Sequence, residues 1–298
     1  MTTPVTVIGG YLGAGKTTLI NRLLRHADGT RLAVLVNEFG ALPIDEDLIE
    51  QTGDNVIAIA GGCICCAFGD NLIGALNDLA QINPAPDHIV IEASGVAIPA
   101  SLAATITLLP AFGLSGVVVL ADAETVRRMA EDAYLSDTIL RQLADADLVV
   151  LTKADLVSDD QRHEVAGWLE GVCGHANIIP ARNGALPNAF VLGPQPRDTP
   201  PRPLPHGDSA FESVVLTPES PTDPARLAKA LAKDGNGVVR AKGFVVDAAG
   251  QRHTIQIVGA RWDISPAPKA GASGIVCIGL AGQLRRDSLN ALVSHQQA

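Results

Sequence analysis

The 298-residue sequence predicts an α/β fold with a mainly parallel sheet flanked by helices, followed by a smaller α+β domain. Short β-branched runs alternate with amphipathic helical patterns over the first two thirds of the chain. Hydrophobic residues make up 47% of the sequence and aromatic residues only 3%, so the core must consist of Ala, Val, Ile and Leu, as in parallel strands covered by helices. The ligand of such a sheet lies beyond the carboxyl ends of its strands.

The alternation of β-branched runs and amphipathic patterns predicts the strands and helices of the sheet domain along the chain. The predicted strands cover Val5–Gly9, Leu32–Val36, Val56–Ala60, His88–Ile91, Gly116–Leu120, Leu148–Thr152 and Asn177–Ile179. The predicted helices cover Thr17–Arg25, Asp70–Gln81, Thr125–Asp132, Asp137–Asp145 and Asp159–Leu169. The apolar stretch Leu102–Ala121 is long enough to span a membrane, but Pro110, Gly113 and Gly116 divide it into a helix end, a turn and a buried strand. With no signal peptide pattern at the N-terminus, we expect a cytoplasmic protein without membrane contact.

A glycine-rich segment directly follows the first predicted strand. It runs Gly10-Tyr11-Leu12-Gly13-Ala14-Gly15-Lys16-Thr17 and opens a predicted helix, which is the arrangement of a P-loop that binds nucleotide phosphates. The glycines let backbone N–H groups turn toward phosphate oxygens, Lys16 neutralises the β- and γ-phosphates, and Thr17 can ligate Mg²⁺. We therefore expect a P-loop NTPase whose nucleotide contacts Gly10, Gly13, Ala14, Gly15, Lys16, Thr17 and Thr18.

A Mg²⁺ ion beside the phosphates needs a carboxylate at a nearby strand end. Glu92 follows the buried run His88–Ile91 and is the expected carboxylate, although a strand-end surface acid has the same pattern. Gly95 would let the backbone approach the γ-phosphate. Glu38 follows another strand to the same edge and is either a further Mg²⁺ candidate or a solvated helix-start charge. Lys16, Thr17 and Glu92 are the expected catalytic residues.

The segment Thr152-Lys153-Ala154-Asp155 follows the buried run Leu148–Leu151 and is expected to choose the base. The Asp155 carboxylate can accept hydrogen bonds from N1–H and the 2-amino group of guanine, and adenine offers neither donor there. Lys153 can lie along the plane of the ring. These features favour GTP over ATP.

Three of the five cysteines are packed into Cys63-Ile64-Cys65-Cys66, after the glycine pair Gly61-Gly62 and before a predicted helix. A helix N-terminus lowers thiol pKa values and favours the thiolate, which binds metal. Three thiolates suit Zn²⁺, or another transition metal such as Co²⁺ or Ni²⁺, and leave a fourth position open. Buried cysteines that act as small hydrophobes and a redox role are the alternatives. An odd cysteine count does not suit a secreted disulfide framework.

A proline-rich segment divides the chain. Residues 193–205 contain six prolines, a density typical of a semi-rigid linker. We expect a nucleotide-binding domain over residues 1–192, a linker over 193–210 and an α+β domain over 211–298. The predicted strands of the last domain cover Phe211–Leu216, Gly237–Val246, His253–Ile257 and Gly274–Ile278, with helices at Pro224–Lys233 and Arg286–Ser294.

The formal charge divides at nearly the same place. Residues 1–210 carry a formal charge of −13 and residues 211–298 one of +3. A chain this acidic gains little from a phosphate backbone, so general nucleic-acid binding is disfavoured.

Taken together, these segments resemble the CobW-like family of metal-trafficking GTPases. The matching segments are Gly9–Leu19, Asn37–Gly40, Gly62–Cys66, Ile91–Gly95 with Pro99, Thr152–Asp155 and, in the C-terminal domain, Arg240–Phe244. The resemblance implies a GTPase in which Glu92 replaces the commoner Mg²⁺-site Asp and Asp155 recognises guanine. It also implies that Cys63, Cys65 and Cys66 bind zinc or another transition metal for delivery to a client metalloprotein. Thr152 departs from the commonest residue, Asn, so the base loop loses an amide.

The sequence thus predicts a two-domain metallochaperone GTPase with GTP or GDP, a transition-metal ion and a client as partners, and leaves homo-oligomer formation open. Hydrolysis would rearrange the segments around Glu38 and Cys63–Cys66 and change metal affinity or client contact. One rival is a nucleotide-gated interaction protein whose cysteines are structural. The other is an ATP-dependent small-molecule kinase, which the Asp155 and cysteine features disfavour.

Overall fold

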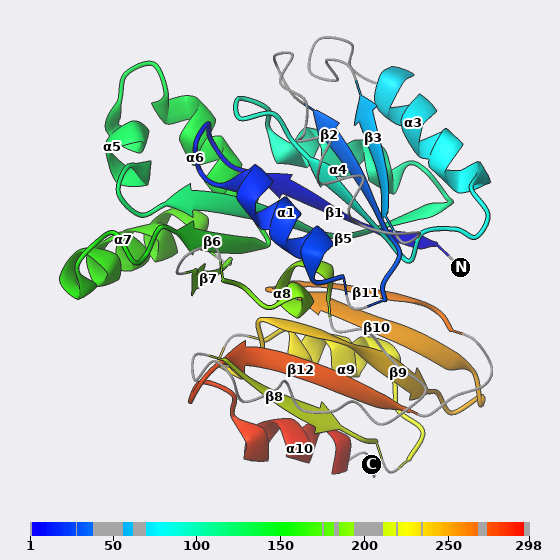
Figure 1. Ribbon diagram of the computed structural model, residues 1–298. Coiled ribbons are helices and arrows are strands. Elements are labelled where there is room, and N and C mark those ends of the chain that lie inside the picture. The colour runs from blue at the N-terminus through cyan, green and yellow to red at the C-terminus, as the bar shows by residue number, and fades with distance from the viewer. Residues whose placement is uncertain are drawn as a thin grey trace. The chain divides into compact units, whose positions relative to one another are not determined.

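The computed structural model describes residues 2–27, 29–37, 56–61, 70–174, 176–181, 185–193, 211–218, 220–233, 235–267 and 273–294. Its contacts divide the chain into two compact units, an N-terminal unit over Thr2–Leu186 and a C-terminal unit over Pro187–Ala298 (Figure 1). The short helix α8 (Asn188–Leu192) belongs to the C-terminal unit by these contacts. Except for Gly193, the predicted linker lies outside the described residues.

The N-terminal unit is built on a parallel sheet, as the alternation of strands and helices predicts. The described strands are β1 (Thr3–Gly9), β2 (Leu32–Asn37), β3 (Val56–Gly61), β4 (His88–Glu92), β5 (Phe112–Asp122), β6 (Leu148–Thr152) and β7 (Asn177–Pro180). They lie in the order β3-β2-β4-β1-β5-β6-β7, and each neighbouring pair is parallel. All described carboxyl ends therefore meet at one edge, where β1 lies at the centre.

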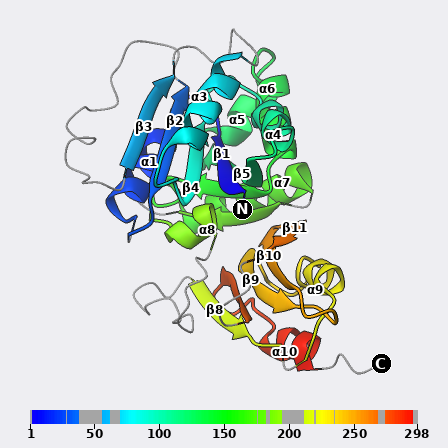
Figure 2. The same cartoon turned by 90° about the vertical axis from the view of Figure 1, so that its right-hand side faces the viewer.

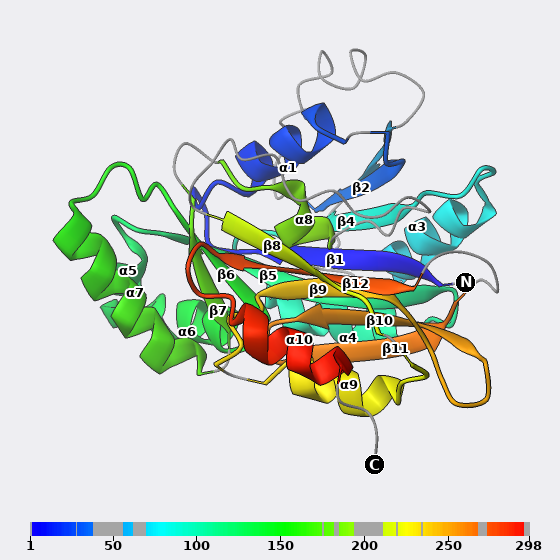
Figure 3. The ribbon, with the colours of Figure 1, turned by 90° about the horizontal axis from the view of Figure 1, so that it is seen from below.

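Helices cover both faces of this sheet. They are α1 (Lys16–Arg25), α3 (Asp70–Gln81), α4 (Pro99–Thr107), α5 (Val126–Glu131), α6 (Ser136–Ala144) and α7 (Asp159–Cys173). Figures 2 and 3 show α1 on one side of β1 and α4 and α6 on the other. The core is aliphatic: Val7, Leu35 and Ile91 of the sheet are fully buried and share one cluster with Leu76 of α3. Burying such side chains is the main force that holds the layers together.

Strand β5 is longer than the sequence predicts, since it begins at Phe112 rather than Gly116. Its pairing with β1 slips by one residue between Leu114 and Gly116, so Ser115 forms a bulge, and Gly116 has φ 150°. The sequence pattern treats Gly116 as a break before the strand, but the bulge allows this glycine to lie inside the strand. The Asp147 carboxylate accepts a hydrogen bond from the Val117 N–H at 2.8 Å and ties this bend to the start of β6.

The C-terminal unit has an antiparallel sheet, with strands β8 (Phe211–Leu216), β9 (Arg240–Val246), β10 (Arg252–Val258), β11 (Arg261–Pro266) and β12 (Gly274–Leu280) in the order β11-β10-β9-β12-β8. Helices α9 (Pro224–Leu231) and α10 (Arg286–Ser294) pack on it around Leu227, Ile257 and Leu289. Strand β11 is absent from the sequence prediction because its exposed Arg261-Trp262-Asp263 start lacks an apolar pattern; it pairs with β10 across the tight turn at Gly259-Ala260. In the described part of the chain, no helix is long and apolar enough to cross a membrane.

Candidate nucleotide site

The loop between β1 and α1 has the strand, loop and helix arrangement that the sequence predicts. Gly15 precedes α1 with a left-handed backbone (φ 94°). Gly10 has φ 129°, and a Cβ atom there would lie 2.5 Å from the Leu120 carbonyl oxygen on β5. Glycine is therefore required at this position, both for the backbone angle and for the close approach to the neighbouring strand. The first N–H groups of α1 point out of this turn toward the carboxyl edge of the sheet.

Lys16 is the first residue of α1 and is only 7% exposed. Its Nζ donates hydrogen bonds to the carbonyl oxygens of Gly10 at 2.9 Å and Tyr11 at 3.3 Å. The ammonium group therefore lies over the loop and within reach of the space that the loop N–H groups face. A buried cation held by neutral carbonyls gains further stabilisation from an anion such as phosphate.

Thr17, in the first turn of α1, meets Glu92 at the end of β4, the strand next to β1. Ile8 on β1 is the register partner of Glu92 on β4, and Thr17 Oγ1 donates a hydrogen bond to Glu92 Oε1 at 3.2 Å. Glu92 is 6% exposed. A hydroxyl and a buried carboxylate are oxygen donors of the kind that Mg²⁺ prefers, and the nearby buried Ser94 Oγ has no hydrogen-bond partner among the described residues. The residues present thus fit a hard divalent cation, and Glu38, the other expected acid, lies outside the described residues.

The segment after Glu92 is held against the P-loop. The Ala93 N–H donates to the Ile8 carbonyl at 2.8 Å. A Cβ atom on Gly95 would lie 2.5 Å from Leu12 Cδ2 and 2.9 Å from the Leu12 nitrogen, so glycine allows this contact. From α6, the Gln142 amide donates to the carbonyl oxygens of Gly95 at 3.1 Å and Ala97 at 2.7 Å. Gln142 is buried, and its two hydrogen bonds hold the Gly95–Ala97 segment in place.

The base loop follows β6 and is joined to the P-loop by Thr152. The Thr152 hydroxyl lies 2.9 Å from the Ala14 carbonyl oxygen and 3.2 Å from that of Ala121, and donates toward both. The hydroxyl therefore links the phosphate side of the site to the base side, although the sequence predicts only the loss of an amide at this position. Asp155 is exposed at the end of the loop, where its carboxylate is accessible to a ligand.

Lys153 adopts a left-handed backbone (φ 55°), which is uncommon for a residue other than glycine. Its Nζ lies 2.6 Å from Asp122 Oδ2, at the end of β5. The hydrogen bond from Lys153 to Asp122 raises the pKa of the lysine above its ordinary value of 10.5. Lys153 is therefore charged at neutral pH and held toward β5.

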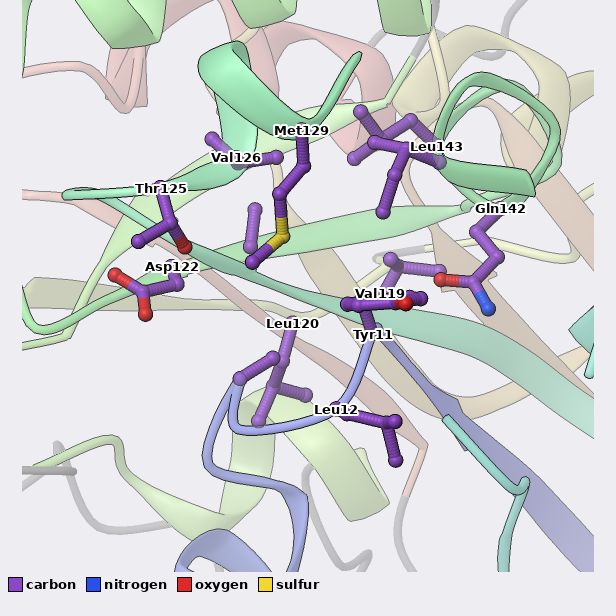
Figure 4. Close-up of a pocket in the computed structure, with 13 residues that line it drawn as sticks. Tyr11, Leu12, Val119, Leu120, Asp122, Thr125, Val126, Met129, Gln142 and Leu143 are labelled. Carbon is purple, nitrogen blue, oxygen red and sulfur yellow. The ribbon is translucent and has the colours of Figure 1, made fainter. Parts of the chain in front are cut away.

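Asp122 and Gln142 are two site residues that sequence reasoning missed. Both line a small apolar cavity of about 20 Å³ between the P-loop and helices α5 and α6. Figure 4 shows Asp122 and Gln142 at opposite ends of this cavity, with Met129 between them. Asp122 had a usable signal, since it ends a buried strand as Glu92 does. Gln142 had none, because its hydrogen-bond partners lie 45 and 47 residues away in the chain.

The expected metal ligands Cys63, Cys65 and Cys66 lie outside the described residues. Strand β3 leads to them: it ends at Gly61, the register partner of Asn37 at the end of β2, on the carboxyl edge that also carries the P-loop. The described residues contain no group of three or more His, Cys, Asp or Glu side chains that could hold a metal ion. Burial raises the pKa of Cys173 to about 11 and that of Cys277 to about 12, so both are neutral thiols.

Comparison with known proteins gives matches over both units. Residues 4–180 match the family described as CobW/HypB/UreG, nucleotide-binding domain, and residues 211–295 match the Cobalamin synthesis protein cobW C-terminal domain. The chain is 33% identical over 307 residues to the Zinc chaperone CobW of a Sinorhizobium species, covering 87% of this chain and 86% of that protein. It is 35% identical over 193 residues to the Zinc-regulated GTPase metalloprotein activator 1 of Schizosaccharomyces pombe, covering 61% and 46%. The Zn(II)-bound YjiA GTPase of E. coli aligns over 100% of both chains, with 23% identity and a TM-score of 0.46.

Proposed function

The chain belongs to the CobW/HypB/UreG family of nucleotide-binding proteins, and from this premise we propose that it is a GTP-hydrolysing metallochaperone that carries zinc to a client protein. The observation that carries the proposal is the meeting of three groups at one sheet edge: Lys16 over the P-loop, the Thr17–Glu92 pair, and the Thr152–Asp155 loop. The relatives named as zinc chaperone and as zinc-regulated GTPase support the choice of metal and nucleotide.

The P-loop residues Gly10, Gly13, Ala14, Gly15, Lys16, Thr17 and Thr18 form the phosphate site in this proposal. Their N–H groups and the Lys16 ammonium balance the charge that develops on the γ-phosphate as water attacks the phosphorus and the bond to the β–γ bridging oxygen breaks. The Gly95 backbone meets the same phosphate. Thr17 and Glu92, with Glu38 as a further candidate, would hold Mg²⁺. When bound, Mg²⁺ neutralises negative charge on the β- and γ-phosphates.

The base site consists of Thr152, Lys153 and Asp155. The exposed Asp155 carboxylate can accept hydrogen bonds from the N1–H and the 2-amino group of guanine, and the Lys153 side chain provides one face for the ring. Thr152 keeps this loop in register with the P-loop through Ala14. The combination selects GTP over ATP.

The transported metal binds to Cys63, Cys65 and Cys66, with zinc first and Co²⁺ or Ni²⁺ as alternatives. Gly61 ends β3 beside Asn37, on the sheet edge that carries the P-loop, and this supports a position of the motif near the phosphate site. GTP hydrolysis would then change metal affinity, and residues 211–298 would form a separate domain beyond a linker at 193–210. A client metalloprotein receives the metal.

An anaerobic titration tests the proposal. Purified apoprotein is titrated with Zn²⁺, Co²⁺ and Ni²⁺, with Mg²⁺ and a nonhydrolysable GTP analogue either present or absent. We expect binding that depends on the nucleotide state, and loss of that binding when the three motif cysteines are replaced by serine. The matched control is Cys173→Ser, which removes a buried thiol of α7.

Two results would contradict the proposal. Metal affinities that are identical with GTP analogue, with GDP and without nucleotide would remove the coupling. Loss of stability in the triple variant, with no metal binding by the wild type, would instead favour structural cysteines. GTP and ATP hydrolysis measured side by side test the base preference, and faster ATP turnover would overturn it.

A further inference from the structure

We propose that Asp122 is a positioning residue of the nucleotide site, which holds the Lys153 side chain in place as one wall of the base-binding surface. The inference rests on the proposed function, because it requires that a guanine nucleotide binds at the Thr152–Asp155 loop. Asp122 itself need not touch the nucleotide; it acts through Lys153.

Backbone contacts orient the Asp122 carboxylate independently of Lys153. Asp122 is the last residue of β5 and the register partner of Thr152, the last residue of β6. The Ala123 N–H donates to the Thr152 carbonyl at 3.0 Å, which continues the pairing beyond the strand. Asp122 Oδ1 accepts a hydrogen bond from the Glu124 N–H at 2.9 Å. The other oxygen, Oδ2, therefore has a set direction, and Lys153 Nζ meets it at 2.6 Å.

The two side chains differ in exposure in a way that suits this role. The Asp122 side chain is 9% exposed and that of Lys153 is 38% exposed. Water screens a charge pair less when one partner is nearly buried, so this pair is stronger than an ordinary surface salt bridge. The ammonium is held at the sheet edge, and part of the lysine side chain stays accessible. The methylene stem can then cover an aromatic ring while the charged end stays bound.

The backbone of Lys153 supports the same conclusion. A left-handed conformation (φ 55°) at a lysine carries strain that persists when surrounding contacts hold it, and such strain gathers at functional sites. Two contacts hold the Lys153 backbone in this conformation. The Asp122 carboxylate accepts a hydrogen bond from the Lys153 ammonium, and the hydroxyl of the preceding residue, Thr152, donates to the Ala14 carbonyl of the P-loop. A lysine without a partner would lose side-chain conformational entropy when the nucleotide binds. A lysine that Asp122 already holds loses less entropy at that step, and this favours nucleotide binding.

The test is the affinity for GDP, measured with purified full-length protein by isothermal titration calorimetry. Asp122→Asn keeps the size of the side chain and removes its charge. We expect it to weaken GDP binding about tenfold, the range for loss of a hydrogen bond to a charged group. The matched control is Glu170→Gln, an exposed acid on α7. We expect no change beyond about twofold for this variant, because an exposed charge is largely screened.

A double-mutant cycle shows whether Asp122 acts through Lys153. Lys153→Met keeps the apolar stem and removes the ammonium. If the inference is right, adding Asp122→Asn to Lys153→Met changes GDP affinity little, whereas the same change in the wild type costs about tenfold. An equal loss in both backgrounds would mean that Asp122 acts by another route, and would overturn the inference. Asp122→Glu retains the charge and should recover part of the affinity, which general instability of position 122 would not allow.

The results separate this inference from the proposed function. If the wild type binds neither GDP nor GTP, the proposed function is wrong. If the wild type binds GDP and Asp122→Asn binds it equally well, the proposed function stands and the inference fails. Thermal unfolding of each variant accompanies the titrations, and the comparison with Asp122→Glu decides the outcome if the asparagine variant does not fold.

Discussion

Glu92 lies at the end of β4 and is only 6% exposed, and Thr17 donates a hydrogen bond to its carboxylate. A charge in such a position is costly unless it is paired or bound to a cation. The pairing of β4 with β1 places this group beside the first turn of α1. The position of Glu92 beside α1 therefore supports a role in the phosphate site, in addition to its place after an apolar run.

Replacing Glu92 with Gln keeps the shape of the side chain and removes its charge. We expect GTP hydrolysis to fall about 10- to 100-fold, because the Mg²⁺ site loses its carboxylate. GDP binding without Mg²⁺ should change much less. The measurements are single-turnover hydrolysis over a range of Mg²⁺ concentrations and GDP titration in EDTA. Glu131→Gln on α5 is the control for removal of one acid; an unchanged Mg²⁺ dependence in Glu92→Gln would contradict this role.

Local sequence patterns are enough to expect Lys16, Thr17 and Glu92 at one edge of the sheet, because a P-loop has fixed spacing and Glu92 follows a buried run. The structure brings Thr17 and Glu92 together there, and the catalytic roles of the three residues stay predictions. Thr152 was predicted for its place in the base loop, but its hydrogen bond to Ala14 spans 138 residues and depends on how β6 lies beside β5 and β1. Asp122 ends a buried strand as Glu92 does, but its pairing with Lys153, 31 residues away, leaves no mark in the sequence.

At the scale of elements, α6 supports the site from behind the sheet edge. Gln142 is the buried polar residue through which α6 holds Gly95 and Ala97. The amphipathic pattern of 137–145 predicts the helix, but it carries no sign of this partner. The sequence also fails to predict the edge strand β11, which lacks an apolar pattern, and the first residues of β5, which precede its bulge. Strand β6 matches the prediction because it is buried along its whole length and apolar up to Thr152.

Gln142→Leu should uncouple α6 from the segment after Glu92. The change leaves the Gly95 carbonyl buried without its donor and costs about 1–3 kcal/mol of unfolding free energy. We expect GTP hydrolysis to fall more than GDP affinity, because Gly95 is proposed to meet the γ-phosphate. Urea unfolding, single-turnover hydrolysis and GDP titration measure the three quantities. The exposed neighbour Arg141→Gln serves as control, and a GDP affinity that falls as much as the hydrolysis rate would contradict the assignment.

In the C-terminal unit, Glu212 joins β8 to the start of α10. Its carboxylate accepts hydrogen bonds from the Leu284 N–H at 2.9 Å and from Arg286 at 3.3 Å. Burial by itself would raise the pKa of Glu212, but these hydrogen bonds and the charge of Arg286 outweigh it and hold the pKa below the ordinary 4.5. Because the folded state lowers this pKa, the charged form stabilises the fold above pH 4.5.

Glu212→Gln should therefore lower stability in a pH-dependent way. The wild type should be more stable than the variant at about pH 7, and the difference should shrink as the pH falls below 4.5 through the folded-state pKa. Urea unfolding of both proteins across this range measures the difference directly. Asp263→Asn, an exposed acid on β11, is the control. A difference that stays constant with pH would show that the charge of Glu212 does not contribute.

At the scale of the whole molecule, each unit has a core of its own. The N-terminal unit buries Val149, Leu151 and Leu169 among others, and the C-terminal unit buries Ile257 and Leu289. Separate cores predict separate responses to mutation. The two tryptophans of the sequence allow this to be observed, because Trp168 belongs to α7 and Trp262 to β11.

Leu289→Ala should destabilise the C-terminal unit by about 2–5 kcal/mol, because it leaves a cavity beside α10. In Trp168→Phe protein, fluorescence reports on Trp262, and we expect its unfolding transition to move to lower urea. In Trp262→Phe protein, fluorescence reports on Trp168, and that transition should stay in place, as should GDP affinity. A matching shift of both transitions would mean that the chain unfolds as one cooperative unit.

The two buried cysteines have a practical consequence for experiments on the thiols. Cys173 and Cys277 are buried and protonated at neutral pH, so they react slowly with maleimides or disulfide reagents while the protein is folded. Of the five cysteines in the sequence, Cys63, Cys65 and Cys66 are left as the source of any fast labelling. The wild-type chain can therefore be titrated with a thiol reagent, with and without zinc, and the protected thiols can be assigned to the motif without removing any other cysteine.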